Sequence, residues 1–142
     1  MNPDINTGFG LPKPLKNPIN SIEFQFEIQP YKRFLVVFYK PTWERVVEFY
    51  IENSIQIPDK EEIFRSDLGG CVTFHNGNWI LFLHETKNLI STITHECCHI
   101  ALNLFSYIGE DKLRTYERNE PFCYLVENLV KTVLNSVWKS ND

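Results

Sequence analysis

The stretch His95-Glu96-Cys97-Cys98-His99 lies in a segment whose apolar residues recur every three or four positions, the spacing of an amphipathic helix. On such a helix His95 and His99 are one turn apart on the same face, so both imidazoles can reach one metal ion. Glu96 follows the first histidine and can accept a proton from a water molecule that the metal polarises. The spacing therefore predicts a helical zinc site that keeps one coordination position for water.

The apolar residues of this segment gather on the side of the helix roughly opposite His95. They are Ile90, Ile93, Cys97, Ile100, Ala101, Leu104 and Ile108. We expect the helix to run from about Thr86 to about Tyr107, with Gly109 close to its C-cap and both histidines pointing away from the core. A helix with two surface histidines and no metal would show the same polar face, so a purely structural role of this helix stays open as the alternative.

Two histidines do not complete a zinc site, and no histidine follows His99 in the chain. The long metzincin pattern is excluded because Leu102 occupies its glycine position and Phe105 its last histidine position. The third ligand must then be a carboxylate or a cysteine further along. The candidates are Glu110, Asp111, Glu117, Glu120, Cys123 and Glu127.

Asn119-Glu120-Pro121-Phe122 resembles the start of the second active-site helix in gluzincins, the zincin metallopeptidases whose third zinc ligand is a glutamate on the next helix. The wider run over residues 119–125 is also similar to a segment of small zincin-like proteins encoded by bacteriophages. The resemblance covers residues 79–130, about a third of the chain. Thermolysin-like gluzincins have an acidic residue where this chain has Tyr124, so the match to that subgroup is incomplete.

The resemblance implies a complete set of site residues. This set is His95, His99 and Glu120 as ligands of Zn²⁺ and Glu96 as the general base. Helical spacing alone supports Glu120 only in part, because it projects far from the core face of its expected helix, as does Glu127 seven residues later. Asn119 is a good N-cap for that helix and would place Glu120 in its first turn. Glu127 and Glu117 stay open as alternative ligands.

The composition suits one folded domain. The chain has 142 residues, of which 43% are hydrophobic and 14% aromatic, enough to build a core. The net charge of −4 argues against nucleic acid or an anionic membrane as the main partner. No apolar run is long enough to cross a bilayer, and the proline-rich start lacks the apolar core of a secretory signal. We expect a cytoplasmic protein with a flexible arm over residues 1–20, one domain over residues 21–142, and reduced cysteines.

The segments before the histidine helix carry alternating strand and helix signals. We expect strands over residues 21–29 and 34–39, a helix over residues 43–53 with Val46, Val47, Tyr50 and Ile51 inward, a short helix near 59–65, and strands over 71–74 and 79–83. The first two strands should pair antiparallel because their link is short, and Asn76-Gly77 predicts a hairpin between the last two. The final helix is expected from about Glu120 to about Trp138.

These elements describe an α+β domain in which helices pack on a mostly antiparallel sheet, as in a small zincin-like domain. If the hairpin forms the sheet edge beside the histidine helix, residues 79–83 could bind an extended peptide as an added strand. We predict a zinc-dependent hydrolase, in the first place a metallopeptidase acting on a peptide or protein. The alternatives are an inactive zincin-like module of a phage or mobile element that binds a protein partner, and a structural protein without metal.

Peptide hydrolysis also needs a donor that stabilises the oxyanion beside the metal. Tyr124, Tyr116 and His84 are the candidates, and nothing in the sequence ranks them. His75 lies next to the expected turn and should be exposed.

Overall fold

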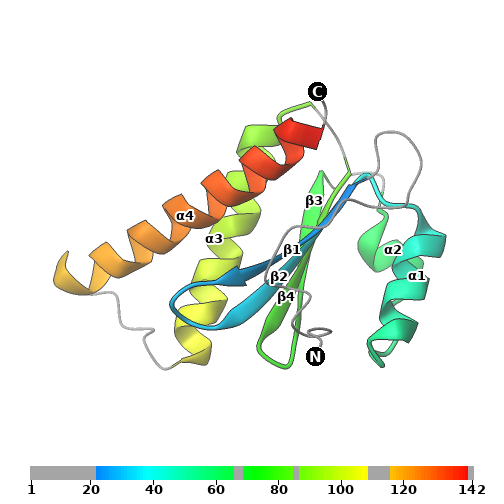
Figure 1. Ribbon diagram of the computed structural model, residues 1–142, viewed down its shortest axis with the longest axis horizontal. Coiled ribbons are helices and arrows are strands. Elements are labelled where there is room, and N and C mark those ends of the chain that lie inside the picture. Colours follow the sequence, from blue (N-terminus) through cyan, green and yellow to red (C-terminus); the bar gives the residue numbers. More distant parts are fainter. Residues whose placement is uncertain (1–21, 66–68, 85–86, 109–115, 141–142) are drawn as a thin grey trace.

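The structure, a computed structural model, describes residues 22–65, 69–84, 87–108 and 116–140 (Figure 1). Its elements are β1 (Ile22–Ile28), β2 (Arg33–Tyr39), α1 (Trp43–Glu52), α2 (Lys60–Ile63), β3 (Gly70–His75), β4 (Asn78–Leu83), α3 (Leu89–Tyr107) and α4 (Tyr116–Ser140). This content confirms the α+β class. The expected arm over residues 1–20 lies outside the described residues.

The strands form one sheet in the order β1-β2-β4-β3. β1 pairs antiparallel with β2, and β3 pairs antiparallel with β4, both as predicted. Asn76 and Gly77 have φ angles of 51° and 86°, the left-handed conformation that a type I′ turn requires. The central pair, β2 and β4, is parallel, so the sheet is mixed. This pair was not foreseen. The crossover through α1 and α2 leads into β3, which runs antiparallel to β2, and the hairpin then reverses the chain into β4, parallel to β2.

The edge strand beside α3 is β3. β4 is hydrogen-bonded to β2 on one side and to β3 on the other, so the expectation that residues 79–83 form an open edge is wrong. The crossover places β4 against β2, and the hairpin then leaves β3 outermost. At this side of the sheet an added peptide strand can therefore pair only with β3.

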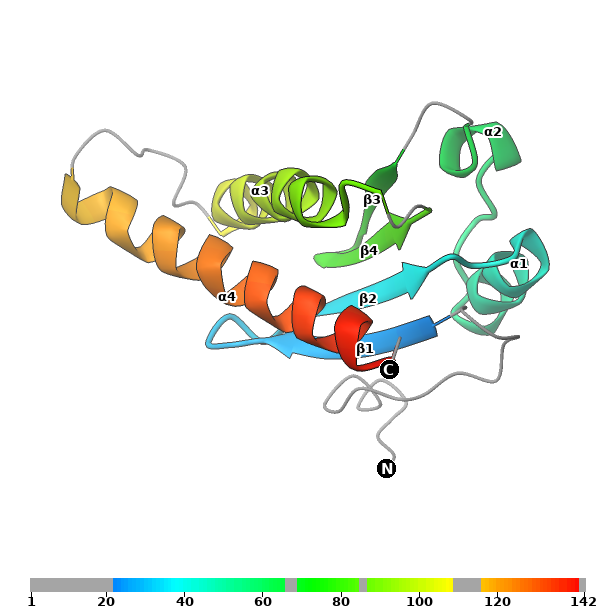
Figure 2. The same cartoon turned by 90° about the horizontal axis from the view of Figure 1, so that it is seen from above.

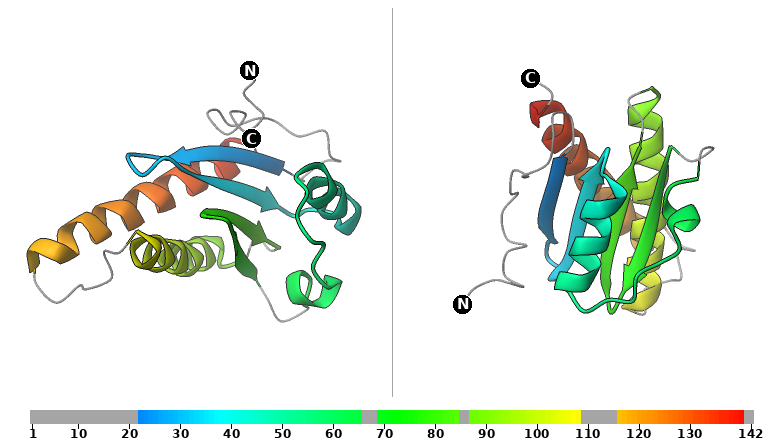
Figure 3. Two further views of the ribbon diagram at one scale, coloured as in Figure 1. Left: turned by 90° about the horizontal axis from the view of Figure 1, so that it is seen from below. Right: turned by 90° about the vertical axis from the view of Figure 1, so that its right-hand side faces the viewer.

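Helices cover both faces of the sheet, with α3 and α4 on one face and α1 and α2 on the other (Figures 2 and 3). Successive side chains of β2 alternate between the two cores. Leu35, Val37 and Tyr39 belong to the core under α3 and α4, whereas Val36 and Phe38 belong to the core under α1. Burial on both faces explains why β2 is a continuous apolar run.

Helix α1 begins where the sequence predicts. The hydroxyl of Thr42 accepts a hydrogen bond from the amide of Arg45 at 3.1 Å and caps the first turn. Its buried residues are Val46, Phe49 and Tyr50. Ile51 is exposed and Val47 only half-buried, so the prediction that these two residues point inward is wrong, and Phe49 is buried in their place.

Helix α4 begins earlier than predicted. It starts at Tyr116, so Asn119 lies inside it and is not its N-cap, and Pro121 interrupts its hydrogen bonds near the start. The buried residues on its core face are Leu125, Leu129, Val133 and Val137. α4 runs antiparallel to α3, and its first turns extend beyond the end of α3 (Figure 2).

Glu23, on the polar side of β1, is buried beneath α1, and only 4% of it is exposed. Its carboxylate accepts two hydrogen bonds from Nη2 of Arg45, at 2.9 Å and 3.0 Å. The buried ion pair ties α1 to the sheet.

We expect Arg45→Ala to lower the free energy of unfolding by about 3 kcal/mol, because it leaves the Glu23 carboxylate buried without a counter-charge. Urea unfolding followed by circular dichroism measures this. Glu48→Ala is the control, since Glu48 contacts the same guanidinium at 2.8 Å but its side chain is 63% exposed. Its loss should stay below about 1 kcal/mol. Equal losses in the two variants would contradict a special role for the buried pair.

Candidate active site

Helix α3 brings the two histidines of the motif together. Their Nε2 atoms are 3.1 Å apart, and both rings are exposed, which leaves space for further ligands. Two nitrogen ligands of a tetrahedral Zn²⁺ lie about 3.3 Å apart, since each is about 2.05 Å from the metal. The pair therefore fits a zinc ion with only a small movement. Without a metal the same contact is a hydrogen bond between two imidazoles.

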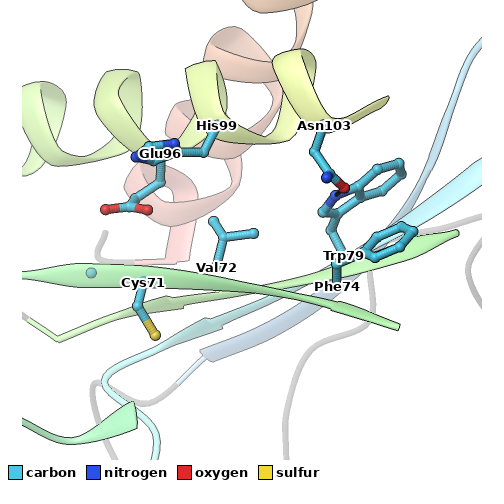
Figure 4. Close-up of a pocket in the computed structure, with 8 residues that line it drawn as sticks. Cys71, Val72, Phe74, Trp79, Glu96, His99 and Asn103 are labelled. Atoms are coloured by element: carbon cyan, nitrogen blue, oxygen red, sulfur yellow. Dashed lines mark hydrogen bonds between the residues drawn. The ribbon is translucent and has the colours of Figure 1, made fainter. Parts of the chain in front are cut away.

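Glu96 lies about 100° around α3 from His95 but only about 60° from His99, and its side chain turns toward β3 (Figure 4). It is 8% exposed, although the two histidines of the motif are exposed to solvent. Burial raises the pKa of its carboxyl above the ordinary value of 4.5, and the nearby His95 and His99 oppose this shift. A carboxylate in such surroundings accepts a proton more readily than a solvated one.

The core face of α3 differs from the predicted one at its two ends. The central members are buried as expected: Ile93, Cys97, Ile100, Ala101 and Leu104. Ile90 and Ile108 are exposed, which corrects the prediction, and Leu89 and Phe105 are buried instead. Packing against α4 explains part of the change, because Phe105 contacts Phe122 with ring centroids 5.7 Å apart. The expected ends of this helix, residues 86 and 109, lie outside the described residues.

A groove of about 470 Å³ lies between α3 and the edge strand β3 (Figure 4). Its lining residues are Gly70, Cys71, Val72, Phe74, Trp79, Glu96, His99 and Asn103. Glu96, His99 and Asn103 share one side of α3, because residues three and seven apart fall on one helix face. The groove thus brings the predicted base and one predicted ligand beside an open strand edge.

Gly70 lets α3 approach β3 closely. A Cβ at this position would lie 2.9 Å from Cγ2 of Thr92 on α3 and 2.9 Å from the carbonyl oxygen of Phe82. Any side chain here would push the helix away from the strand.

The open edge of β3 offers backbone hydrogen-bonding groups. The amide of His84 donates to the carbonyl of Gly69 at 2.8 Å, in register with the β3–β4 ladder. Bonded and non-bonded pairs alternate along an antiparallel ladder, so the odd-numbered residues of β3 bond to β4. The N–H and C=O groups of Gly70, Val72 and Phe74 therefore point to the open edge.

Glu120, the predicted third ligand, is not brought to the histidine pair. Among the described residues no three side chains of His, Cys, Asp or Glu converge as a metal site. Because Phe105 packs on Phe122 in antiparallel helices, Glu120 lies level with the end of α3. That position is about 12 Å along the helix axis from His99, at about 1.5 Å per residue. Glu120 as a ligand stays a prediction.

Two of the alternative ligands, Glu127 and Cys123, are exposed on α4. Glu127 lies nearly level with His99, but its carboxylate is 3.1 Å from Nζ of Lys131. The side chain of Glu117 and all of residues 110 and 111 lie outside the described part of the chain.

The candidate oxyanion donors do not line the groove. His84 packs in the other core, Tyr124 is exposed on α4, and the side chain of Tyr116 is outside the described part. Asn103 lines the groove instead, although it was not predicted as a site residue. Its position four residues after His99, on the face of the motif, was the signal that could have found it.

His84 has a structural environment on the side of α2. Its Nε2–H donates to the carbonyl of Ile63 at 2.7 Å, and its ring packs against Phe64 and Phe82. Burial lowers the pKa of the imidazole below 6.5, and the hydrogen bond to the carbonyl opposes this shift. His75 lies partly buried beside the turn, and burial lowers its pKa as well, so the expectation of an exposed side chain is wrong.

We expect the free energy of unfolding to fall as the pH is lowered from about 7 to about 5.5. The unfolded chain binds a proton on His84 near pH 6.5, whereas the folded protein binds it only at lower pH. The stabilising contribution is therefore complete above the unfolded pKa and is lost as the pH falls toward the folded one. His84→Gln keeps a donor for Ile63 and removes the titrating group, so urea unfolding at the two pH values should show a smaller difference. An unchanged difference would contradict this role.

No protein-family model matches the chain, and comparison with curated proteins and with solved structures finds no match. Within the described residues, no helix combines the length and apolar character needed to cross a bilayer. All four cysteines are free, as predicted. Any functional conclusion therefore depends on the geometry of the site itself.

Proposed function

We propose that this protein is a zinc-dependent hydrolase that cuts an extended peptide bound in the groove between α3 and β3. The observation that carries this proposal is that Glu96 is buried on the groove wall directly beside two imidazoles whose Nε2 atoms are 3.1 Å apart. Among the described residues no Lys or Arg pairs with Glu96. A buried carboxylate without a cationic partner costs stability, which a purely structural helix has no reason to bear.

The chain's own residues divide the chemistry between them. His95 and His99 would hold the metal, with Glu120 predicted as the third ligand from the gluzincin resemblance. When bound, Zn²⁺ would polarise the scissile carbonyl and make a nearby water molecule more acidic. The Glu96 carboxylate would take the proton of the attacking water and pass it to the leaving amine.

The open edge of β3 supports a peptide as substrate. Outward-facing backbone groups at alternate residues can pair with an added strand, and this is the interaction that gives β-augmentation its affinity. A peptide that adds antiparallel to β3 runs from the level of Phe74 toward that of Gly70. Its residues on the amino-terminal side of the cut bond would therefore lie over Phe74.

Two exposed aromatic rings lie at the Phe74 end of the groove and favour apolar side chains in the part of the peptide that binds there. Phe74 and Tyr107 are 40% and 47% exposed, and their ring centroids are 5.4 Å apart. The guanidinium of Arg33 stacks over Tyr107, 4.8 Å from its centroid, and holds the ring in place. The ring of Trp79 packs against that of Phe74.

The test is cleavage of a mixed peptide library by zinc-loaded protein, with the products identified by mass spectrometry. We expect cleavage sites enriched in apolar residues on their amino-terminal side, loss of cleavage after chelation, and recovery when zinc is returned. A protein that binds zinc stoichiometrically but cuts no peptide would contradict the hydrolase and favour a metal-binding interaction module. A protein that binds no zinc would contradict both.

A further inference from the structure

We infer that Asn103 is a substrate-binding residue, whose side-chain amide donates a hydrogen bond to a backbone carbonyl of the peptide bound along β3. The inference rests on the proposed function, because it names a contact to the same substrate. Asn103 lies on α3 four residues after His99 and lines the same groove. Neither the motif nor the gluzincin resemblance assigns it a role.

The orientation of this amide follows from its partner. The indole Nε1–H of Trp79 donates to Oδ1 of Asn103 at 2.8 Å (Figure 4). An indole nitrogen can only donate, so the amide oxygen must face Trp79 and the NH₂ group must face away from it. Trp79 is 1% exposed and is held by the core, so it fixes the amide in this orientation.

A donor on this wall meets a need of the bound strand. Alternate residues of an added strand pair with β3, and the residues between them direct their N–H and C=O groups to the opposite side. Helix α3 forms the other wall of the groove that a bound peptide fills, so these groups can find partners on it. On that wall, Glu96 is proposed to transfer the proton and His99 to bind the metal. The side-chain amide of Asn103 offers a neutral donor for a peptide carbonyl.

The position of Asn103 also predicts which carbonyl it binds. Trp79 pairs with Phe74 in the sheet and contacts Asn103, so Asn103 is level with Phe74. Along α3 it is seven residues, or about 10 Å, beyond Glu96. An extended peptide covers that distance in about three residues. The carbonyl should therefore belong to a residue about three positions on the amino-terminal side of the cut bond.

The test uses zinc-loaded Glu96→Gln protein, so that a bound peptide is not cut, and one probe, an acetylated and amidated alanine heptapeptide with a single phenylalanine near its amino end. Asn103→Asp is added to this background. Aspartate still accepts the indole hydrogen bond but presents an oxygen instead of a donor to the groove. We expect the Kd of the probe to rise about tenfold, as for the loss of one hydrogen bond. Asn135→Asp on α4 makes the same charge change at an exposed site and should leave the Kd unchanged.

Nuclear magnetic resonance distinguishes a residue that contacts the peptide from a residue that has only a structural role. The side-chain NH₂ signals of Asn103 are assigned by their absence in Asn103→Asp, and a retained Trp79 indole signal shows that this variant is folded. On addition of the probe, the Asn103 NH₂ signals should shift together with the backbone amides of Val72 and Phe74. Shifts at Val72 and Phe74 without a shift at Asn103 would overturn this inference alone. No shift anywhere in the groove would overturn the peptide-binding proposal as well.

Discussion

Glu96→Gln is expected to lower kcat by about 100- to 10,000-fold while the bound zinc stays near one ion per chain. Glutamine has the shape of glutamate but cannot accept the proton of the attacking water, so the step that needs a base is lost. The histidine pair does not depend on this side chain, since its two Nε2 atoms meet directly. Burial raises the pKa of Glu96, so a neutral amide in its place should not destabilise the fold.

The measurement combines turnover of a peptide found in the library assay, elemental analysis of zinc, and urea unfolding. Glu44→Gln is the matched control, because Glu44 is an exposed acid in the first turn of α1 on the other face of the sheet. It should leave kcat unchanged. If Glu96→Gln kept full activity with full zinc, Glu96 would not be the base and the mechanism would be wrong.

Loss of zinc is the expected result for His99→Ala, with a fall in metal affinity of more than about 100-fold. Even removal of a hydrogen-bond partner of a metal ligand costs about 10- to 100-fold in affinity, so removal of the ligand itself should cost more. Activity should disappear with the metal. Zinc competition with a fluorescent chelator measures the affinity, and His84→Gln is the control because it removes an imidazole that packs in the other core.

The same zinc titration decides the third ligand. If Glu120 binds the metal, Glu120→Ala should weaken zinc far more than Glu127→Ala, and α4 must shift from its described position when zinc binds. The reverse order would assign the ligand to Glu127, which already lies nearly level with His99 but must first release Lys131. Unchanged affinity in His99→Ala would exclude the motif as a metal site.

Most of the secondary structure could be predicted because its signals are local. Alternating apolar residues mark β1, a continuous apolar run marks β2, and Asn76-Gly77 marks the hairpin, since only residues that accept positive φ fit such a turn. The Thr42 cap marks the start of α1. The beginning of α4 was missed because residues 117–119 are polar and a proline, here at position 121, is favoured at the start of a helix.

The pairing of distant segments could not be predicted. The parallel contact of β2 with β4 joins strands separated by two helices, and no short-range pattern encodes it. That contact makes β3 the edge, and with it the groove opposite Glu96. The hydrogen bond from Trp79 to Asn103 likewise joins residues 24 positions apart in the chain.

The sequence by itself determined the histidine pair, because a separation of four residues on an α-helix places two side chains one turn apart whatever the helix packs against. It also determined that Glu96 would project from a neighbouring face. Only the tertiary structure decided that this face would be buried against an open strand edge and that Asn103 would share it. Which acid can join the histidines depends on the register of α4 along α3, and that register is set by the packing of Phe105 on Phe122 and of the apolar residues that follow, not by any local spacing.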